Sequence, residues 1–189
     1  MPLRLTPLMK KRLTRRAAEM IDRSLTHFPE LNGQAITVGV TRKHLGSATV
    51  VYRKGEIMKM IIRLRVRKVT YQTIGHELTH LVQGLTHGDR ARKADPSHIP
   101  SGEKQCDVWT LARHPLFCDD PPTYIKMPRA MRANWFDYAD GVRDLCIAAI
   151  AKRQTHRQYL RWLESEIHRL AASRPTKKAP YPMQLPLIF

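Results

Sequence analysis

The feature that most constrains the fold of this chain is a change of periodicity at residues 67–70. Before it, apolar and basic side chains alternate at every second position, which is typical of a strand with one buried face. The apolar face carries Met58, Met60, Ile62, Leu64 and Val66, and the basic face carries Lys59, Arg63, Arg65 and Arg67. After it, over 70–84, apolar residues recur at steps of three and four, which predicts a helix. A strand that leads directly into an amphipathic helix favours an α+β fold, with the helix packed on the apolar face of a sheet.

The rest of the sheet is expected to come from the residues just before this strand. Two further strands are predicted over 36–40 and 49–53, where β-branched and apolar residues dominate. Lys54-Gly55 has the composition of a hairpin turn between the second and third strands. We therefore expect a small sheet, mixed or antiparallel, packed on the helix over 70–84.

Helices are predicted before and after these strands along the chain. A basic helix fits residues 6–25, with Thr6 as its cap. Helical periodicity returns over 103–113 and, in one or two pieces, over 130–172. Residues 1–172 are long enough for one domain with a mainly helical C-terminal part. The proline-rich residues 173–189 cannot form a regular helix and are expected to be a tail.

The predicted helix over 70–84 contains His76-Glu77-Leu78-Thr79-His80, an H-E-x-x-H motif. Residues four apart lie on one face of a helix, so both imidazoles can bind one metal ion. Glu77 is next to the first histidine, where it can polarise a metal-bound water without occupying the coordination sphere. The motif therefore predicts a metal site with a catalytic carboxylate.

A catalytic zinc takes three protein ligands, and two residues compete for the third place. Glu103 begins the next predicted helix, and Asp107 one turn later can accept a hydrogen bond from a ligand imidazole. His87 lies seven residues after His80. We favour Glu103, because its helix also supplies the supporting carboxylate.

The segments TIGHELTHLVQ and GEKQCDVWTLAR resemble the gluzincin zinc metallopeptidases, and they are most similar to the small minigluzincins. The resemblance implies a zincin-like domain with its motif core over 57–113. It also implies that a strand borders the substrate cleft, a place that 57–67 fits. The implied ligands of Zn²⁺ are His76, His80 and Glu103, with Glu77 as general base and acid and Asp107 orienting a ligand histidine.

The activity that this resemblance implies is endopeptidase cleavage of a peptide or protein, through a zinc-bound water activated by Glu77. Some small gluzincins are held latent by their own termini, so residues 173–189 are a candidate zymogen segment, acting within one chain or between two chains of a homodimer. The residue that steadies the oxyanion stays open at this point. The candidates are Tyr124, Tyr138, Tyr181, His98 and His114.

Two other functional hypotheses compete with a gluzincin peptidase. SprT-like proteases, which act on proteins attached to DNA, also use H-E-x-x-H, with a histidine often followed by glycine as the third ligand, and His87-Gly88 imitates that pair. The net charge of +17, from 33 Lys and Arg against 16 Asp and Glu, fits a nucleic-acid partner. A non-enzymatic, zinc-stabilised nucleic-acid-binding module is the third reading.

Several classes of protein are disfavoured by the sequence. The longest apolar run, 145–151, is much shorter than the roughly 20 residues of a membrane-spanning helix, and no secretory signal is visible. The three cysteines form no C-x-x-C pair, which argues against a disulfide framework. We therefore expect a cytoplasmic protein without a membrane partner. Cys106 is expected to be a buried thiol that points toward the core rather than the metal.

Overall fold

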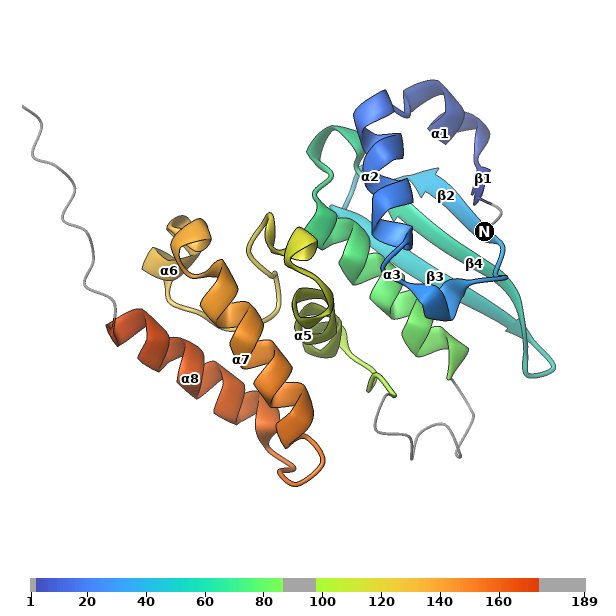
Figure 1. The fold of residues 1–189 in the computed structure, drawn as a ribbon. Helices are drawn as coiled ribbons and strands as arrows, with labels where there is room; N and C mark the ends of the chain where they lie inside the picture. The colour runs from blue at the N-terminus through green and yellow to red at the C-terminus, as the bar shows by residue number, and fades with distance from the viewer. Residues whose placement is uncertain (1–2, 87–97, 174–189) are drawn as a thin grey trace, which may run out of the picture.

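The computed structural model describes residues 3–86 and 98–173, and it has an α+β fold built on a four-stranded mixed sheet (Figure 1). This confirms the predicted class. The strands lie in the order β1-β2-β4-β3, with β1, β2 and β4 parallel and β3 antiparallel to β4. Their bounds are Leu3–Leu5 for β1, Ile36–Val40 for β2, Gly46–Arg53 for β3 and Glu56–Leu64 for β4.

A tight hairpin joins β3 to β4, as the sequence predicts. Lys54 and Gly55 have φ values of 52° and 86°, and a two-residue turn with positive φ at both positions matches the twist of the strands. The hairpin is longer than expected, because β3 begins at Gly46 rather than at residue 49. Since β4 also pairs with β2, β4 is an inner strand and β3 is an edge of the sheet.

Two short helices replace the single N-terminal helix that the sequence predicts. Helix α1 covers Pro7–Arg12 and α2 covers Arg15–Leu25, separated by an extended Leu13. The cause is a second cap: Thr14 Oγ1 accepts a hydrogen bond from Ala17 N at 3.2 Å and starts a new helix, just as Thr6 starts α1.

The helix that carries H-E-x-x-H is α3, Tyr71–Leu85, and it packs on the sheet face that α2 also covers (Figure 1). Thr70 caps it, and the carboxylate of Asp119 accepts the backbone N–H groups of Tyr71 and Gln72, each at 2.8 Å. The buried surfaces are those expected, except that Met58 is 57% exposed and Val66 lies in a turn after β4. The facing sets are Ile74, Leu78 and Leu81 on α3, and Met60, Ile62 and Leu64 on β4.

The C-terminal part is helical but consists of separate pieces. Helix α5 packs against both α3 and α7, so it joins the sheet to the C-terminal helices (Figure 1). The predicted stretch over 130–172 forms α6, α7 and α8. None of the described helices is long and apolar enough to cross a membrane. The bounds are Glu103–Arg113 for α5, Arg129–Ala133 for α6, Ala139–Lys152 for α7 and Tyr159–Ser173 for α8, with short 3-10 turns at Pro29–Leu31, Val66–Lys68, Pro115–Cys118 and Trp135–Asp137.

Helices α3 and α5 approach each other closely at Gly75. A Cβ at this position would lie 2.6 Å from a ring carbon of Phe117 and 2.7 Å from the methyl group of Thr110, which is too close for any larger residue. Next to it, the hydroxyl groups of Thr79 and Thr110 hydrogen-bond across the two helices at 2.8 Å. Gly75 therefore sets the spacing of the two helices that carry the motif residues.

Candidate metal centre

His76 and His80 lie one turn apart on α3, and both face the first residue of α5. The Nε2 atom of each imidazole is 3.0 Å from the same carboxylate oxygen, Oε2 of Glu103. His76 is buried, His80 is partly exposed, and the Glu103 side chain is about half exposed. The three residues predicted as ligands are therefore brought together by two helices; that they bind a metal stays a prediction.

A buried carboxylate fixes the ring of His76 from behind. Asp107 Oδ1 accepts a hydrogen bond from His76 Nδ1 at 2.8 Å and another from the side-chain amide of Gln72 at 3.1 Å. Its other oxygen accepts the backbone N–H groups of Tyr124 and Ile125 at 2.6 and 3.2 Å. Because the Asp107 carboxylate can only accept, Nδ1 donates to it, and Nε2 is the ring nitrogen that faces Glu103.

The ring of His80 is held in a matching orientation by an amide. Gln83, three residues later on α3, donates to the carbonyl of Pro100 at 2.5 Å, so its Oε1 is free to accept from His80 Nδ1 at 3.0 Å. Each of the two imidazoles therefore has its Nδ1 engaged by a side chain behind the ring and its Nε2 directed at Glu103. The sequence carries a signal for Gln83, because residues three apart on a helix are neighbours.

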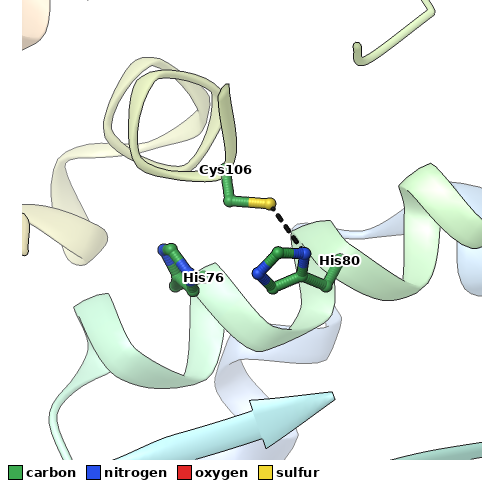
Figure 2. Close-up of side chains that lie close together, drawn as sticks. All are labelled: His76, His80 and Cys106. Atoms are coloured by element: carbon green, nitrogen blue, oxygen red, sulfur yellow. Dashed lines mark hydrogen bonds between the residues drawn. The ribbon is translucent and has the colours of Figure 1, made fainter. Parts of the chain in front are cut away.

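The prediction that Cys106 points toward the core and away from the metal site is wrong. It is fully buried, but its Sγ lies 3.2 Å from Nδ1 of His80, as Figure 2 shows. The close crossing of α3 and α5 turns this face of α5 toward the histidines rather than toward the core. Burial, and then the carboxylates of Glu103, Asp107 and Glu77, raise the pKa of the thiol far above its usual range.

Two sets of side chains thus offer three ligand atoms. His76, His80 and Cys106 form a group that could hold a metal ion, with ligand atoms all within 4.8 Å of one another. The second set replaces Cys106 with Glu103 and uses both Nε2 atoms. His87, the alternative third ligand from the sequence, lies outside the described residues.

Glu77 is buried at the floor of the site, directly against the edge strand. A Cβ on Gly46 of β3 would lie 2.5 Å from Glu77 Oε1, so only glycine leaves room for the carboxylate. Burial raises the pKa of Glu77 from 4.5 to about 7, the charge of His76 opposes this rise and the charge of Glu103 adds to it. A carboxyl group with such a pKa exchanges protons readily at neutral pH, as general acid–base catalysis requires.

A cleft of about 620 Å³ opens above these residues. One wall is the start of β3 and the loop before it, so the strand beside the cleft is β3; the expectation that 57–67 takes this place is wrong, because β4 lies inside the sheet. The carbonyl of Leu45 accepts a hydrogen bond from Arg65 N at 2.9 Å, so Leu45 and every second residue after it turn their backbone N–H and C=O groups toward β4. It follows that the backbone groups of Gly46, Ala48 and Val50 point to the free edge.

Of the four oxyanion candidates that the structure describes, one borders the cleft. Tyr124 lines it and stacks on the ring of His76, with ring centres 5.5 Å apart. Tyr138 is buried in the core and His114 stacks on His27, while His98 is not among the cleft residues. Tyr181 lies outside the described residues. No local pattern in the sequence distinguishes Tyr124, since its position depends on Asp107, which binds its backbone N–H.

Comparison with known proteins leaves the function to be inferred from this geometry. No family model, no curated protein and no solved structure matches the chain. The inference therefore rests on the four side chains that meet at the cleft floor, His76, Glu77, His80 and Glu103, and on the strand edge beside them.

Proposed function

We propose that this chain is a zinc-dependent metallopeptidase with a zincin-like core of the gluzincin type. The observation that carries the proposal is the convergence of His76 Nε2 and His80 Nε2 on one oxygen of Glu103, at 3.0 Å each. A tetrahedral zinc with bonds of about 2.0–2.1 Å separates its ligand atoms by roughly 3.3 Å, so a small outward movement accommodates the ion. Glu77 lies beside this group on the same helix.

Zinc and the Glu103 set agree best with the chemistry of the donors. Two imidazole nitrogens and one carboxylate oxygen are a common ligand set of catalytic zinc. Burial raises the pKa of Glu103, but its hydrogen bonds with His76 and His80 outweigh burial and lower that pKa overall, so the carboxylate is already charged. A thiol must be deprotonated to coordinate, and burial makes this difficult for Cys106.

The roles of the remaining side chains follow from their positions. A zinc ion held there would supply Lewis-acid polarisation of the scissile carbonyl and of a water molecule. Glu77 takes a proton from the attacking water and returns it to the nitrogen of the leaving segment. Asp107 keeps His76 in the ligating tautomer. The hydroxyl of Tyr124, at the cleft, is our candidate donor for the oxygen that becomes negative during attack.

A peptide substrate is supported by the free edge of β3. The outward N–H and C=O groups of Gly46, Ala48 and Val50 can pair with an extended peptide, as in strand addition to a sheet. Antiparallel pairing is the more stable arrangement. A peptide bound this way passes Glu77, which lies against Gly46.

The experiment that tests the proposal compares the full-length chain, loaded with one equivalent of zinc, with its Glu77→Gln variant on a mixed peptide library. Glu77→Gln keeps the shape of the side chain but cannot carry the proton, so we expect turnover to fall at least about 10²-fold with unchanged zinc content. Cleavage at the wild-type rate by the variant contradicts the role of Glu77. Unfolding on zinc removal with no cleavage by either protein favours a non-enzymatic zinc module.

A second pair of variants tests the ligand set. Glu103→Gln should weaken zinc binding strongly, whereas Cys106→Ala should leave the zinc affinity within a few-fold, because the thiol lies beside Nδ1 of His80 and not beside its Nε2. Affinity is measured by competition with a chromogenic chelator. The reverse order of effects assigns the third ligand to the thiol.

A DNA-associated peptidase is the second candidate function. Its support is the net charge of +17, together with the opposite face of the sheet, which none of the labelled helices covers and to which Lys59 and Arg63 belong (Figure 1). Binding to mixed-sequence DNA should then weaken steeply with salt. Binding that is indifferent to salt contradicts this candidate.

Latency and self-association through the C-terminus remain expectations from the sequence. Residues 174–189 lie outside the described residues. Removal of everything after Ala172 should raise the peptidase rate if the tail occupies the cleft, and an unchanged rate and oligomeric state contradict an inhibitory tail.

A further inference from the structure

The cleft extends past the metal centre to a basic wall. Lys43 and Arg65 both line it, and both are exposed. Arg65 lies beside Leu45, whose carbonyl accepts its backbone N–H at 2.9 Å, and Leu45 immediately precedes Gly46. The two cations are thus placed just beyond the point where Glu77 meets β3.

These two charges are not neutralised within the described part of the chain. Neither side chain takes part in an ion pair or a side-chain hydrogen bond there. Among the described residues that line the cleft, two carry carboxylates. Glu103 is bound to both histidines, and the charges that act on Glu77 are those of His76 and Glu103. An anion that enters this end of the cleft therefore meets two unpaired cations.

The direction of the strand tells which end of a peptide reaches them. Strand β3 runs from Gly46 to Arg53, so a peptide paired antiparallel to it has its C-terminal side at Gly46. Residues of the substrate advance by about 3.4 Å each along this edge. The first few residues after the scissile bond consequently pass Lys43 and Arg65.

We propose that Lys43 and Arg65 form a carboxylate-binding subsite on the C-terminal side of the scissile bond. This inference rests on the proposed peptidase function and names its substrate class: peptides that present a carboxylate shortly after the cleaved bond. The carboxylate is either the side chain of an aspartate or glutamate or the free α-carboxylate of a short peptide, since both offer the same two oxygens to a pair of cations.

The test measures binding, so that it does not depend on turnover. The zinc-loaded Glu77→Gln chain is titrated against fluorescein-labelled octapeptides, and binding is measured by fluorescence anisotropy. The peptides are neutral apart from one position among five to eight, which carries either glutamate or glutamine. Each peptide is made with a free and with an amidated C-terminus. We expect one glutamate position or the free C-terminus to bind about 5- to 20-fold more tightly than its neutral counterpart, a preference that shrinks in 0.5 M salt.

Two double variants make the assignment specific. Lys43→Gln with Arg65→Gln should abolish the preference, whereas the charge-matched control, Lys10→Gln with Lys11→Gln on the exposed side of α1, should retain it. Equal affinity for acidic and neutral peptides, or equal loss in both variants, overturns the subsite.

Cleavage of the same peptides by the wild-type chain separates the two proposals. Cleavage without any acidic preference overturns the subsite alone, while tight acidic binding without cleavage retains the subsite and overturns the peptidase.

Discussion

Replacing Gly46 by alanine tests whether the edge strand positions the carboxylate of Glu77, our proposed general base. The added methyl carbon would lie 2.5, 2.7 and 2.9 Å from Oε1, Cγ and Cδ of Glu77. Non-bonded heavy atoms prefer separations of about 3.5–4.0 Å, so the carboxylate must move by roughly 1 Å. A displacement of that size at a reacting group costs about 10²-fold in rate, so we expect kcat on a library peptide to fall by about that factor.

The fold should tolerate this change, which keeps the prediction specific to catalysis. Gly46 is not among the described glycines with positive φ, so alanine fits its backbone, and the group displaced is a side-chain end. Zinc content and Tm should stay close to wild type. The matched control is Gly39→Ala in β2, whose Cβ would meet nothing nearer than 3.5 Å. A Gly46→Ala chain with wild-type kcat, or a control that loses as much, refutes the reasoning.

Three further predictions concern the site. Because burial raises the pKa of Glu77 from 4.5 to about 7, the folded chain binds more protons than the unfolded chain between those values, and its stability falls as pH rises through that window. Glu77→Gln should therefore stabilise the metal-free chain by about 1–3 kcal/mol at pH 8 and not at pH 4. The free energy of unfolding is measured with urea in the presence of a chelator, and the same gain at both pH values contradicts the prediction. Asp107→Asn should weaken zinc binding about 10- to 100-fold in chelator competition, because it no longer fixes the His76 tautomer, and an unchanged affinity removes that role. Tyr124→Phe should lower kcat about 10- to 100-fold with little change in KM or zinc content, and a loss confined to KM makes Tyr124 a binding residue only.

Local periodicity accounts for the parts of the fold that the sequence predicts well. Helix α3 and the apolar face of β4 follow from spacing alone. Ile74 and Leu78 are four residues apart on the buried face of α3, and Met60 belongs to the alternating apolar positions of β4. The hairpin follows from Lys54-Gly55, since few residue pairs accept two positive φ values. In each case the signal lies within a few residues of the element that it specifies.

The parts that the sequence did not predict depend on pairing between distant segments. Which strand borders the cleft depends on strand order, and the parallel pairing of β2 with β4 has no local signal. The same holds for Cys106, whose direction is set by how closely α5 crosses α3, and for Tyr124, whose placement depends on the Asp107 carboxylate. The second cap at Thr14 is different, because threonine is a common capping residue and its sequence signal is local. Apolar residues continue at steps of four across Thr14, and this pattern favoured one unbroken helix.

The close contact at Gly75 has an evolutionary consequence. Since His76 and His80 lie on one helix and Glu103 on the other, a bulkier residue at position 75 would separate these proposed ligands unless Thr110 or Phe117 became smaller at the same time. Position 75 should therefore covary with positions 110 and 117 among relatives that retain all three ligands. In lineages that lose the three proposed ligands this restraint is relaxed, and substitution of the glycine should accompany or follow their loss.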